Sequence, residues 1–407
     1  MMDTTTPSWP TGRSTRAAFE KRFGSEHADF MQEAMHTGDP LADAVVEAIQ
    51  EDSQVRAQLN QGVKNGLASV ENPHQAVVAL LTECETMPDF SPFLSKEELQ
   101  EVLKRGNRPW YVFPQVVTDI GLSAGSLTQL YTSLPLTTVL NGTGRLIEGV
   151  GRRLIETTHW LDTAMYPGNM LPGRRGYVET VQVRMIHAYV RWASLKKGYD
   201  TAALGTPLSQ SEMGFSWYSF SMTCLIAAEE MGFSLTPTET AEFYTYWGYL
   251  GYLLGINPRY YLGVTNHKQA MHGSLMEEMV KGTIQNDGGA LSKAMNTAVG
   301  LAAEGDFLQS EIDADPVEVI ECLVHRFHGY TVAESLGVPF HTETYFKLGM
   351  YVSAVRSEQA KLRNHPEEWK LAISANLKAA ADKLGTGIGG QTSYQAAAAG
   401  TLDSHEI

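Results

Sequence analysis

A histidine lies between two arginines in the segment VQVRMIHAYVRW, residues 181–192. At roughly 100° per residue, Arg184 and Arg191 fall about 40–60° from His187 on a helical wheel, so all three side chains project from one side. An imidazole can bind a metal ion, and a guanidinium pairs with anionic groups. Most of the remaining residues in this segment are apolar, which predicts a buried helix. Buried charges have to be paired, so this helix must face anionic partners.

Two interpretations are open for this stripe of three side chains, Arg184, His187 and Arg191. In the first, Arg184 and Arg191 pair with carboxylates elsewhere in the chain and His187 is an ordinary core histidine. In the second, the stripe faces an anionic cofactor that an imidazole can ligate. Haem fits the second description, because its iron accepts an imidazole as the proximal ligand and its propionates attract cations.

Other residues could form a different metal site. The stretches EAMH (33–36) and ETTH (156–159) both have the spacing Glu-x-x-His. Pairs of such motifs, with two further glutamates, hold two iron ions in helical bundles. A carboxylate-bridged di-iron site is therefore an alternative, although this short motif arises easily by chance. His325 and His328 are close enough to share a metal, but they are interpreted as ordinary surface or core histidines.

The elements that would position these residues are helices. Residues 16–104 mix charged and apolar residues at helical spacing, and SKEELQEVLKRG (95–106) has a serine cap, an acidic first turn and a closing glycine. YPGNMLPGRRG (166–176) reads as a loop, and 235–258 as a helix that opens at Thr-Pro and ends before Asn-Pro. Strand signals are weak, so the sequence predicts an all-α protein. The aromatic stretch 242–255 fits core packing or the wall of an apolar substrate channel.

Composition narrows the class of protein. The 407 residues carry 31 Lys and Arg against 46 Asp and Glu, a net charge of −15, which disfavours nucleic acid as a partner. Three cysteines without CxxC spacing disfavour a disulfide scaffold. No secretory signal is visible, and the longest apolar patches, such as 249–256, are far shorter than a membrane span. We expect a soluble, cytoplasmic protein without a transmembrane segment.

The expected organisation is a single large helical domain. Residues 1–15 are rich in Thr, Pro and Ser and are expected to be flexible, and residues 381–407 form a flexible tail rich in Gly and Ala. Residues 16–380 would then form the domain, which is long enough for a sizeable core.

Two stretches around the histidine helix carry a family resemblance. They are IGLSAGSLTQLYTSLPLTTVLNGTGRLIEGVGRRLIETTHW (120–160) and YPGNMLPGRRGYVETVQVRMIHAYVRW (166–192). The R-L-x-x-T element, the Gly/Pro loop and the V-R-x-x-H-A-x-V-R helix together resemble the catalytic domain shared by latex clearing proteins and the fungal mycophenolic acid side-chain oxygenase. The resemblance covers roughly 90–350. It implies a globin-like helical core around one haem b, with additional N- and C-terminal helices, and cleavage of a carbon–carbon double bond by dioxygen.

The resemblance also implies roles for single residues. His187 matches the proximal iron ligand, and Arg184 and Arg191 match the arginines that flank it. Arg153 and Thr157 match the arginine and threonine on the distal side, where catalysis takes place.

The chain departs from the rubber oxygenases at two positions. Glu156 stands where they have a distal lysine, and Thr137 stands where they have a catalytic glutamate. We therefore expect Arg153, Glu156 and Thr157 to act on a hydrophobic small molecule that contains an alkene, with dioxygen as co-substrate. A haem protein with peroxide-dependent or ligand-sensing activity and the di-iron oxygenase remain alternatives.

Overall fold

The computed structural model describes residues 8–142, 150–283, 286–302 and 312–386. Within these ranges the ordered elements are helices, and the extended pairing is limited to an isolated bridge between Phe90 and Leu94. The all-α prediction is therefore confirmed.

The elements of the N-terminal part are α1 (Arg16–Phe23), α2 (Ser25–Ala34), α3 (Pro40–Glu51), α4 (Gln54–Asn65), η1 (Leu67–Ser69), α5 (Gln75–Glu85), α6 (Lys96–Arg105) and η2 (Arg108–Val112). The central elements are α7 (Gln115–Ile120), η3 (Gly121–Leu127), α8 (Thr128–Leu130), α9 (Leu134–Gly142), α10 (Val150–Met165), α11 (Arg175–Lys196), α12 (Thr201–Leu204), α13 (Gln210–Tyr218), η4 (Ser219–Thr223), α14 (Cys224–Glu230), α15 (Pro237–Leu253), η5 (Pro258–Tyr260), α16 (His267–Val280) and α17 (Asn286–Ala302). The C-terminal elements are α19 (Pro316–His328), α20 (Tyr330–Ser335), α21 (Thr342–Arg363) and α22 (Pro366–Thr386).

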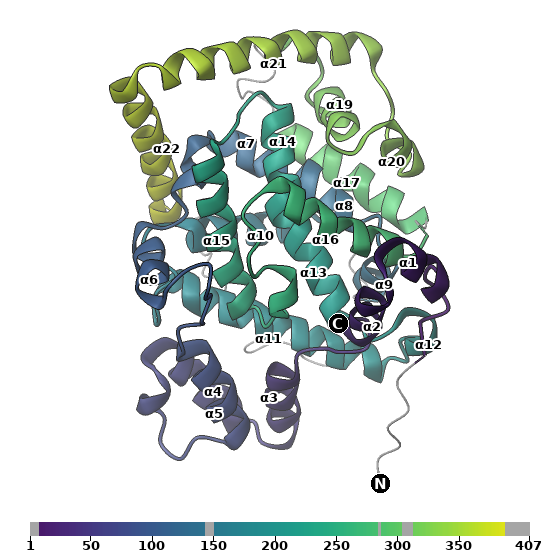
Figure 1. Cartoon of the computed structure of the whole chain (residues 1–407), viewed down its shortest axis with the longest axis vertical. Coiled ribbons are helices and arrows are strands. Elements are labelled where there is room, and N and C mark those ends of the chain that lie inside the picture. Colours follow the sequence, from purple (N-terminus) through teal and green to yellow (C-terminus); the bar gives the residue numbers. More distant parts are fainter. Residues whose placement is uncertain (1–7, 143–149, 284–285, 303–311, 387–407) are drawn as a thin grey trace.

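The long helix α11 crosses the molecule below its centre (Figure 1). Helices α3, α4 and α5 lie together on its lower side, and α21 crosses the opposite end of the molecule. One large hydrophobic cluster joins most of the elements between them. Helix α3 packs directly on α11. Ala42 and Val46 of α3 contact Ala188 of α11 in a small, separate hydrophobic cluster.

Local capping fixes where several helices begin. Ser95 forms a capping box with Glu98 at the start of α6, and Thr236 forms another with Glu239 at the start of α15. Each box satisfies two backbone N–H groups that a helix N-terminus leaves unpaired. The predicted loop 166–176 lies between Met165, the last residue of α10, and the first turn of α11.

The two termini predicted to be flexible, 1–15 and 381–407, lie partly outside the described residues, which leave out 1–7 and 387–407. Inside them, Arg13 is buried and pairs with Glu212, and α22 continues to Thr386. No described helix is long and apolar enough to cross a membrane.

Helices α10 and α11 approach each other closely at one glycine. A Cβ atom on Gly176 would lie 3.0 Å from Ala164 Cα and 3.0 Å from the carbonyl oxygen of Thr163. Backbone atoms cannot give way as a flexible side chain can, so a side chain at this position would push the two helices apart. The contact pins the end of α10 against the start of α11.

Candidate active site

The two arginines of α11 are held by acidic residues from the N-terminal helices. Arg184 has a side chain only 3% exposed, and its Nε and Nη2 donate to Asp39 Oδ2 and Oδ1 at 2.6 and 3.0 Å. Its Nη1 donates to Glu83 Oε1 at 2.7 Å. A bidentate contact of this kind is stronger and more directional than a single ionic hydrogen bond. Arg184 is therefore fully engaged by carboxylates.

Arg191 is held in a similar way one turn after the histidine. Its Nε donates to both carboxylate oxygens of Asp43, at 3.0 and 3.1 Å, and its Nη1 donates to the carbonyl oxygen of Leu208 at 2.8 Å. Burial raises the pKa of the Asp43 carboxyl, although Arg191 acts in the opposite direction. The two ion pairs join α3 to α11 on either side of His187.

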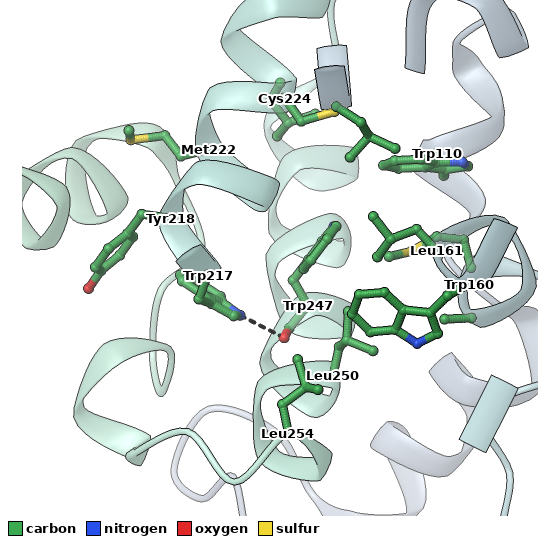
Figure 2. Packing of buried hydrophobic residues seen from close by; sticks show 14 of the residues in the cluster. Trp110, Trp160, Leu161, Trp217, Tyr218, Met222, Cys224, Trp247, Leu250 and Leu254 are labelled. Atoms are coloured by element: carbon green, nitrogen blue, oxygen red, sulfur yellow. Dashed lines mark hydrogen bonds between the residues drawn. The ribbon is translucent and has the colours of Figure 1, made fainter. Parts of the chain in front are cut away.

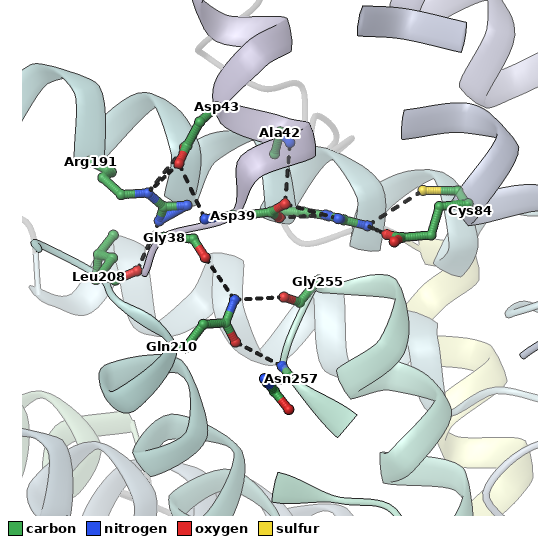
Figure 3. A network of polar contacts seen from close by, with 12 residues as sticks. Gly38, Asp39, Ala42, Asp43, Cys84, Arg191, Leu208, Gln210, Gly255 and Asn257 are labelled. Atoms are coloured by element: carbon green, nitrogen blue, oxygen red, sulfur yellow. Dashed lines mark hydrogen bonds and ion pairs between the residues drawn. The ribbon is translucent and has the colours of Figure 1, made fainter. Parts of the chain in front are cut away.

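The start of α3 is built to present these acids. Asp39 is the N-cap of α3, where its Oδ1 accepts from the backbone N–H of Ala42, and Pro40 follows at the first helical position. The Gln210 amide donates to the carbonyl oxygens of Gly38 and Gly255 at 2.8 and 2.9 Å (Figure 3). The Gln210 side chain thereby connects the residues just before α3 with the turn that follows α15.

Gly255 lets that turn come close to the ion pair. Its φ is +70°, and a Cβ there would lie 2.3 Å from Asp39 Oδ2 and 2.6 Å from Arg184 Nε. A side chain would therefore collide with the pair as well as strain the backbone.

His187 lies between the two ion pairs, half-buried on α11. Its Nδ1 is buried and has no hydrogen-bond partner among the described residues. Burial, helped by the positive charge of Arg191, lowers the pKa of the imidazole to about 4. The ring is therefore neutral near pH 7, which is the form that binds a metal ion. An orphaned, neutral imidazole fits an iron ligand better than a satisfied core histidine does.

The structure supports one half of each interpretation of the stripe. The arginines pair with carboxylates, as the first interpretation requires, while His187 keeps an unpartnered nitrogen, as the second requires. Two guanidinium groups face three carboxylates, from Asp39, Asp43 and Glu83, so the cluster has no excess positive charge for propionates. Contact between these two arginines and a cofactor stays a prediction.

The expected distal residues lie on α10. Glu156 and Thr157 are half-buried, while the side chain of Arg153 lies outside the described residues. Trp160 Nε1 donates to Thr180 Oγ1 at 3.1 Å and links α10 to α11. Arg153 stands seven residues before Trp160, and His187 stands seven after Thr180.

Helices α10 and α11 run antiparallel on either side of the loop that joins them. The hydrogen bond between Trp160 and Thr180 places these two residues at the same level. Arg153 and His187, each seven residues further from the loop, therefore also lie level with each other. Thr157 lies one turn nearer the link. The backbone register thus places the residues predicted on α10 along the same helix pair as the histidine. Thr137 on α9 is buried, and its Oγ1 donates to the carbonyl oxygen of Ser133 at 2.9 Å, so its hydroxyl has a structural use.

The alternative metal sites are not assembled in the described part of the chain, where no three His, Cys, Asp or Glu side chains are grouped to hold a metal ion. His36 bonds to the carbonyl oxygen of Ser8, and His159 bonds to Arg175. His325 bonds to backbone carbonyls at residues 338 and 339, and His328 to the carbonyl oxygen of Ala124. The two Glu-x-x-His motifs therefore do not converge there.

Sequence reasoning missed the acidic partners and two polar residues on α17. Asp39 and Asp43 have an i,i+4 spacing in GDPLAD, which the sequence shows but which only the fold connects to α11. Ser292 and Asn296, also one turn apart, are buried with Ser292 Oγ and Asn296 Oδ1 unpartnered among the described residues. Helix α17 packs on α10, so these groups are candidates for lining the site.

The fold and the site define an all-helical protein in which α11, packed between α3 and α10, carries a neutral imidazole with an unpartnered ring nitrogen. Residues 115–341, more than half of the chain, match the family described as "ER-bound oxygenase mpaB/B'/Rubber oxygenase, catalytic domain". The chain belongs to this family, which confirms the resemblance noted in the sequence.

A solved structure of latex clearing protein in the closed state is similar to this chain. The TM-score is 0.61 at 17% sequence identity, over 84% of this chain and 91% of that one. At such low identity the likeness establishes the shared fold only. A search of curated proteins gave no match.

Proposed function

We propose that this protein is a haem b-dependent oxygenase that cleaves a carbon–carbon double bond of a hydrophobic small molecule with dioxygen. The observation that carries the proposal is His187, a neutral imidazole with a buried, unpartnered Nδ1 in the family's histidine helix. Membership of an oxygenase family supports the reaction class. When bound, the haem iron would supply the activation of dioxygen for a cleavage that leaves two carbonyl groups.

The chain's own residues would bind, orient and shield the reactants. We assign His187 as the ligand that holds the iron. Arg184 and Arg191 would act on the cofactor side of α11 through the acids of α3, which fix the rotation of the helix and thereby the direction of the imidazole. Packed helices on both sides of α11 would exclude bulk water from the histidine.

On α10, we assign Arg153, Glu156 and Thr157 to the catalytic side. A guanidinium at 153 would attract anionic groups, and the Thr157 hydroxyl would donate a hydrogen bond to a polar group of the bound reactants. The Glu156 carboxyl would hold or release a proton at its oxygen atoms, and it stands where the rubber oxygenases have a lysine. A cytoplasmic location stays a prediction.

The experiment incubates purified, haem-loaded protein with a panel of isoprenoid alkenes under ¹⁸O-labelled dioxygen. We expect carbonyl products that carry the label. Turnover that requires hydrogen peroxide and ignores dioxygen would instead assign a peroxide-dependent haem enzyme. A His272→Ala variant, altered at an exposed histidine of α16, provides the matched control and is expected to behave as wild type.

A further inference from the structure

A buried tyrosine is connected to solvent through a base. Tyr244 on α15 is fully buried, and its phenol oxygen lies 3.0 Å from His267 Nδ1. His267 Nε2 lies 3.2 Å from Glu229 Oε1. Because an ionised carboxylate only accepts hydrogen bonds, Nε2 carries the imidazole hydrogen, and Nδ1 accepts the phenol proton. The side chain of His267 is 31% exposed, so this chain of hydrogen bonds leads from the core to the surface.

Several other tyrosines donate their hydroxyl proton to a backbone carbonyl rather than to an imidazole. The buried Tyr218 and Tyr246 and the half-buried Tyr252 each donate to a backbone carbonyl oxygen, at 2.9, 2.5 and 2.6 Å respectively. A peptide carbonyl does not take up a proton near neutral pH. Burial raises the pKa of the Tyr244 phenol well above its ordinary value, so this phenol keeps its proton in the resting protein. Loss of an electron would make the proton strongly acidic, and His267 is placed to receive it.

Tryptophans lead from Tyr244 into the core. The Trp217 ring lies 6.2 Å from the Tyr244 ring, and its Nε1 donates to the carbonyl oxygen of Trp247 at 2.8 Å. The Trp247 ring lies 6.5 Å from that of Trp110 (Figure 2). The buried Nε1 of Trp247 has no partner among the described residues. An oxidised indole without a base keeps its proton and remains a strong oxidant, so it passes the oxidation on.

The candidate active site touches the same cluster. Trp160 stands on α10 three residues after Thr157 and bonds to α11 through Thr180. Figure 2 shows Trp160 in one apolar cluster with Trp247, in the neighbourhood of Leu250. The helix pair that carries the candidate site is thus packed against the tryptophans that lead to Tyr244.

We propose that these tryptophans and Tyr244 form an electron-transfer route that removes oxidising equivalents from the active site and delivers them to the Tyr244–His267–Glu229 group, which connects the core to the surface. The inference rests on the proposed function for its oxidant: a haem held by His187 would supply a one-electron oxidant when a peroxide enters the site without substrate. One electron passes from Tyr244 through Trp217 and Trp247 to the oxidant, which is reduced by one equivalent.

The proton of the Tyr244 hydroxyl moves to His267 Nδ1, which gives a neutral phenoxyl radical and an imidazolium. A one-electron reductant of the ascorbate class in solution then returns the electron, and the proton returns from His267. Each step balances in charge and atoms, and the route leaves the protein unchanged after one cycle.

The test mixes substrate-free, haem-loaded protein with hydrogen peroxide, freezes it quickly and records electron paramagnetic resonance spectra. We expect a tyrosyl signal that narrows when the protein is made with ring-deuterated tyrosine. Tyr244→Phe should lose most of this signal, and His267→Gln should reduce it while keeping the fold. Tyr246→Phe is the matched control, because Tyr246 is buried on the same helix but bonds to a backbone carbonyl. Equal signals in the Tyr244→Phe and Tyr246→Phe proteins would overturn the route.

A second arm separates this inference from the proposed function. A flash-generated ruthenium(III) tris-bipyridine complex replaces haem and peroxide as the one-electron oxidant in the same proteins. We expect the tyrosyl yield to fall in the Tyr244→Phe and His267→Gln proteins but not in Tyr246→Phe. If the protein binds no haem but its tyrosyl yield still falls in the Tyr244→Phe and His267→Gln variants, the proposed function is contradicted and the radical site is not. If the tyrosyl yield is the same with and without Tyr244, the assignment of the radical site is contradicted.

Discussion

Asp39 and Arg184, 145 positions apart in the chain, form a two-point ion pair on the helical turn before His187. Their side chains are 8% and 3% exposed, so neither charge can turn to water if the other is removed. The pair joins the N-cap of α3 to the middle of α11. It thereby makes the orientation of the histidine helix depend on an N-terminal helix that lies outside the family match.

Removing the carboxylate should destabilise the whole domain. We predict that Asp39→Ala lowers the free energy of unfolding by about 3–5 kcal/mol, because it leaves a buried guanidinium with an unpaired edge. Urea denaturation followed by circular dichroism measures the effect. Glu358→Ala, which breaks an exposed pair with Lys361, is the control and should change stability by less than about 1 kcal/mol. Equal effects of the two substitutions would show that the Asp39 pair is not structural.

The second ion pair should matter less, because Asp43 is more accessible. The Asp43 side chain is 33% exposed, so water can replace part of its contact with Arg191. We predict a loss of about 1–2 kcal/mol for Asp43→Ala in the same denaturation experiment, which is less than a fully buried charged hydrogen bond would give because water reaches Asp43. Arg191→Lys should also lose stability, since an ammonium cannot reproduce the planar guanidinium contacts. A larger loss for Asp43→Ala than for Asp39→Ala would contradict this ranking by burial.

Glu277 should make stability depend on pH. It is buried on α16 and accepts a 2.6 Å hydrogen bond from Ser211, and burial raises its pKa to about 8. The folded protein therefore holds this proton up to about pH 8, whereas the unfolded chain releases it near the ordinary value of 4.5. The contribution of this protonated group to the free energy of unfolding is fully present below pH 4.5. It is lost as the pH rises to about 8, by roughly 1.4 kcal/mol for each pH unit.

A neutral amide at this position removes the titration. We predict that stability falls less steeply between pH 5 and pH 8 in Glu277→Gln than in wild type, in urea midpoints collected across that range. Glu343→Gln on exposed α21 serves as the control and should keep the wild-type slope. Identical slopes for Glu277→Gln and wild type would mean that Glu277 is already ionised in the folded protein.

Glu156 tests the assignment of the distal side. We predict that Glu156→Gln keeps its haem, alters the ferric spectrum or its pH dependence and slows turnover, because an amide cannot exchange a proton as a carboxyl does. Glu156→Lys should shift the ferric spectrum toward a six-coordinate form with a nitrogen ligand. Wild-type spectra and rates in both variants across pH would require that Arg153 and Thr157 be withdrawn from the site together with Glu156.

Local sequence signals predicted the helices well where one short stretch determines the outcome. The cap at Ser95, the Thr-Pro start of α15 and the loop before α11 follow from hydrogen bonds and backbone angles within a few residues. The apolar character of 181–192 correctly indicated a buried helix. That inference needed only helical periodicity and the low content of exposed polar residues.

The partners of the arginines could not be predicted in the same way. The charge on Arg184 requires an acid, but many of the 46 acidic residues could supply it. Asp39 is selected by tertiary packing of α3 on α11, through contacts between residues more than a hundred positions apart. The orphaned Nδ1 of His187 likewise depends on what surrounds the ring, and no spacing rule in the sequence encodes that environment.

The central claim is that His187 binds the iron of a haem, and an absorption spectrum tests it most directly. Purified wild-type protein supplied with haem should show a strong Soret band and a pyridine haemochrome of the b type. His187→Ala should lose most of the bound haem while its far-ultraviolet circular dichroism stays helical, and His272→Ala should retain it. Wild-type protein without a Soret band, or a His187→Ala protein with full haem content and an unchanged spectrum, would contradict the account.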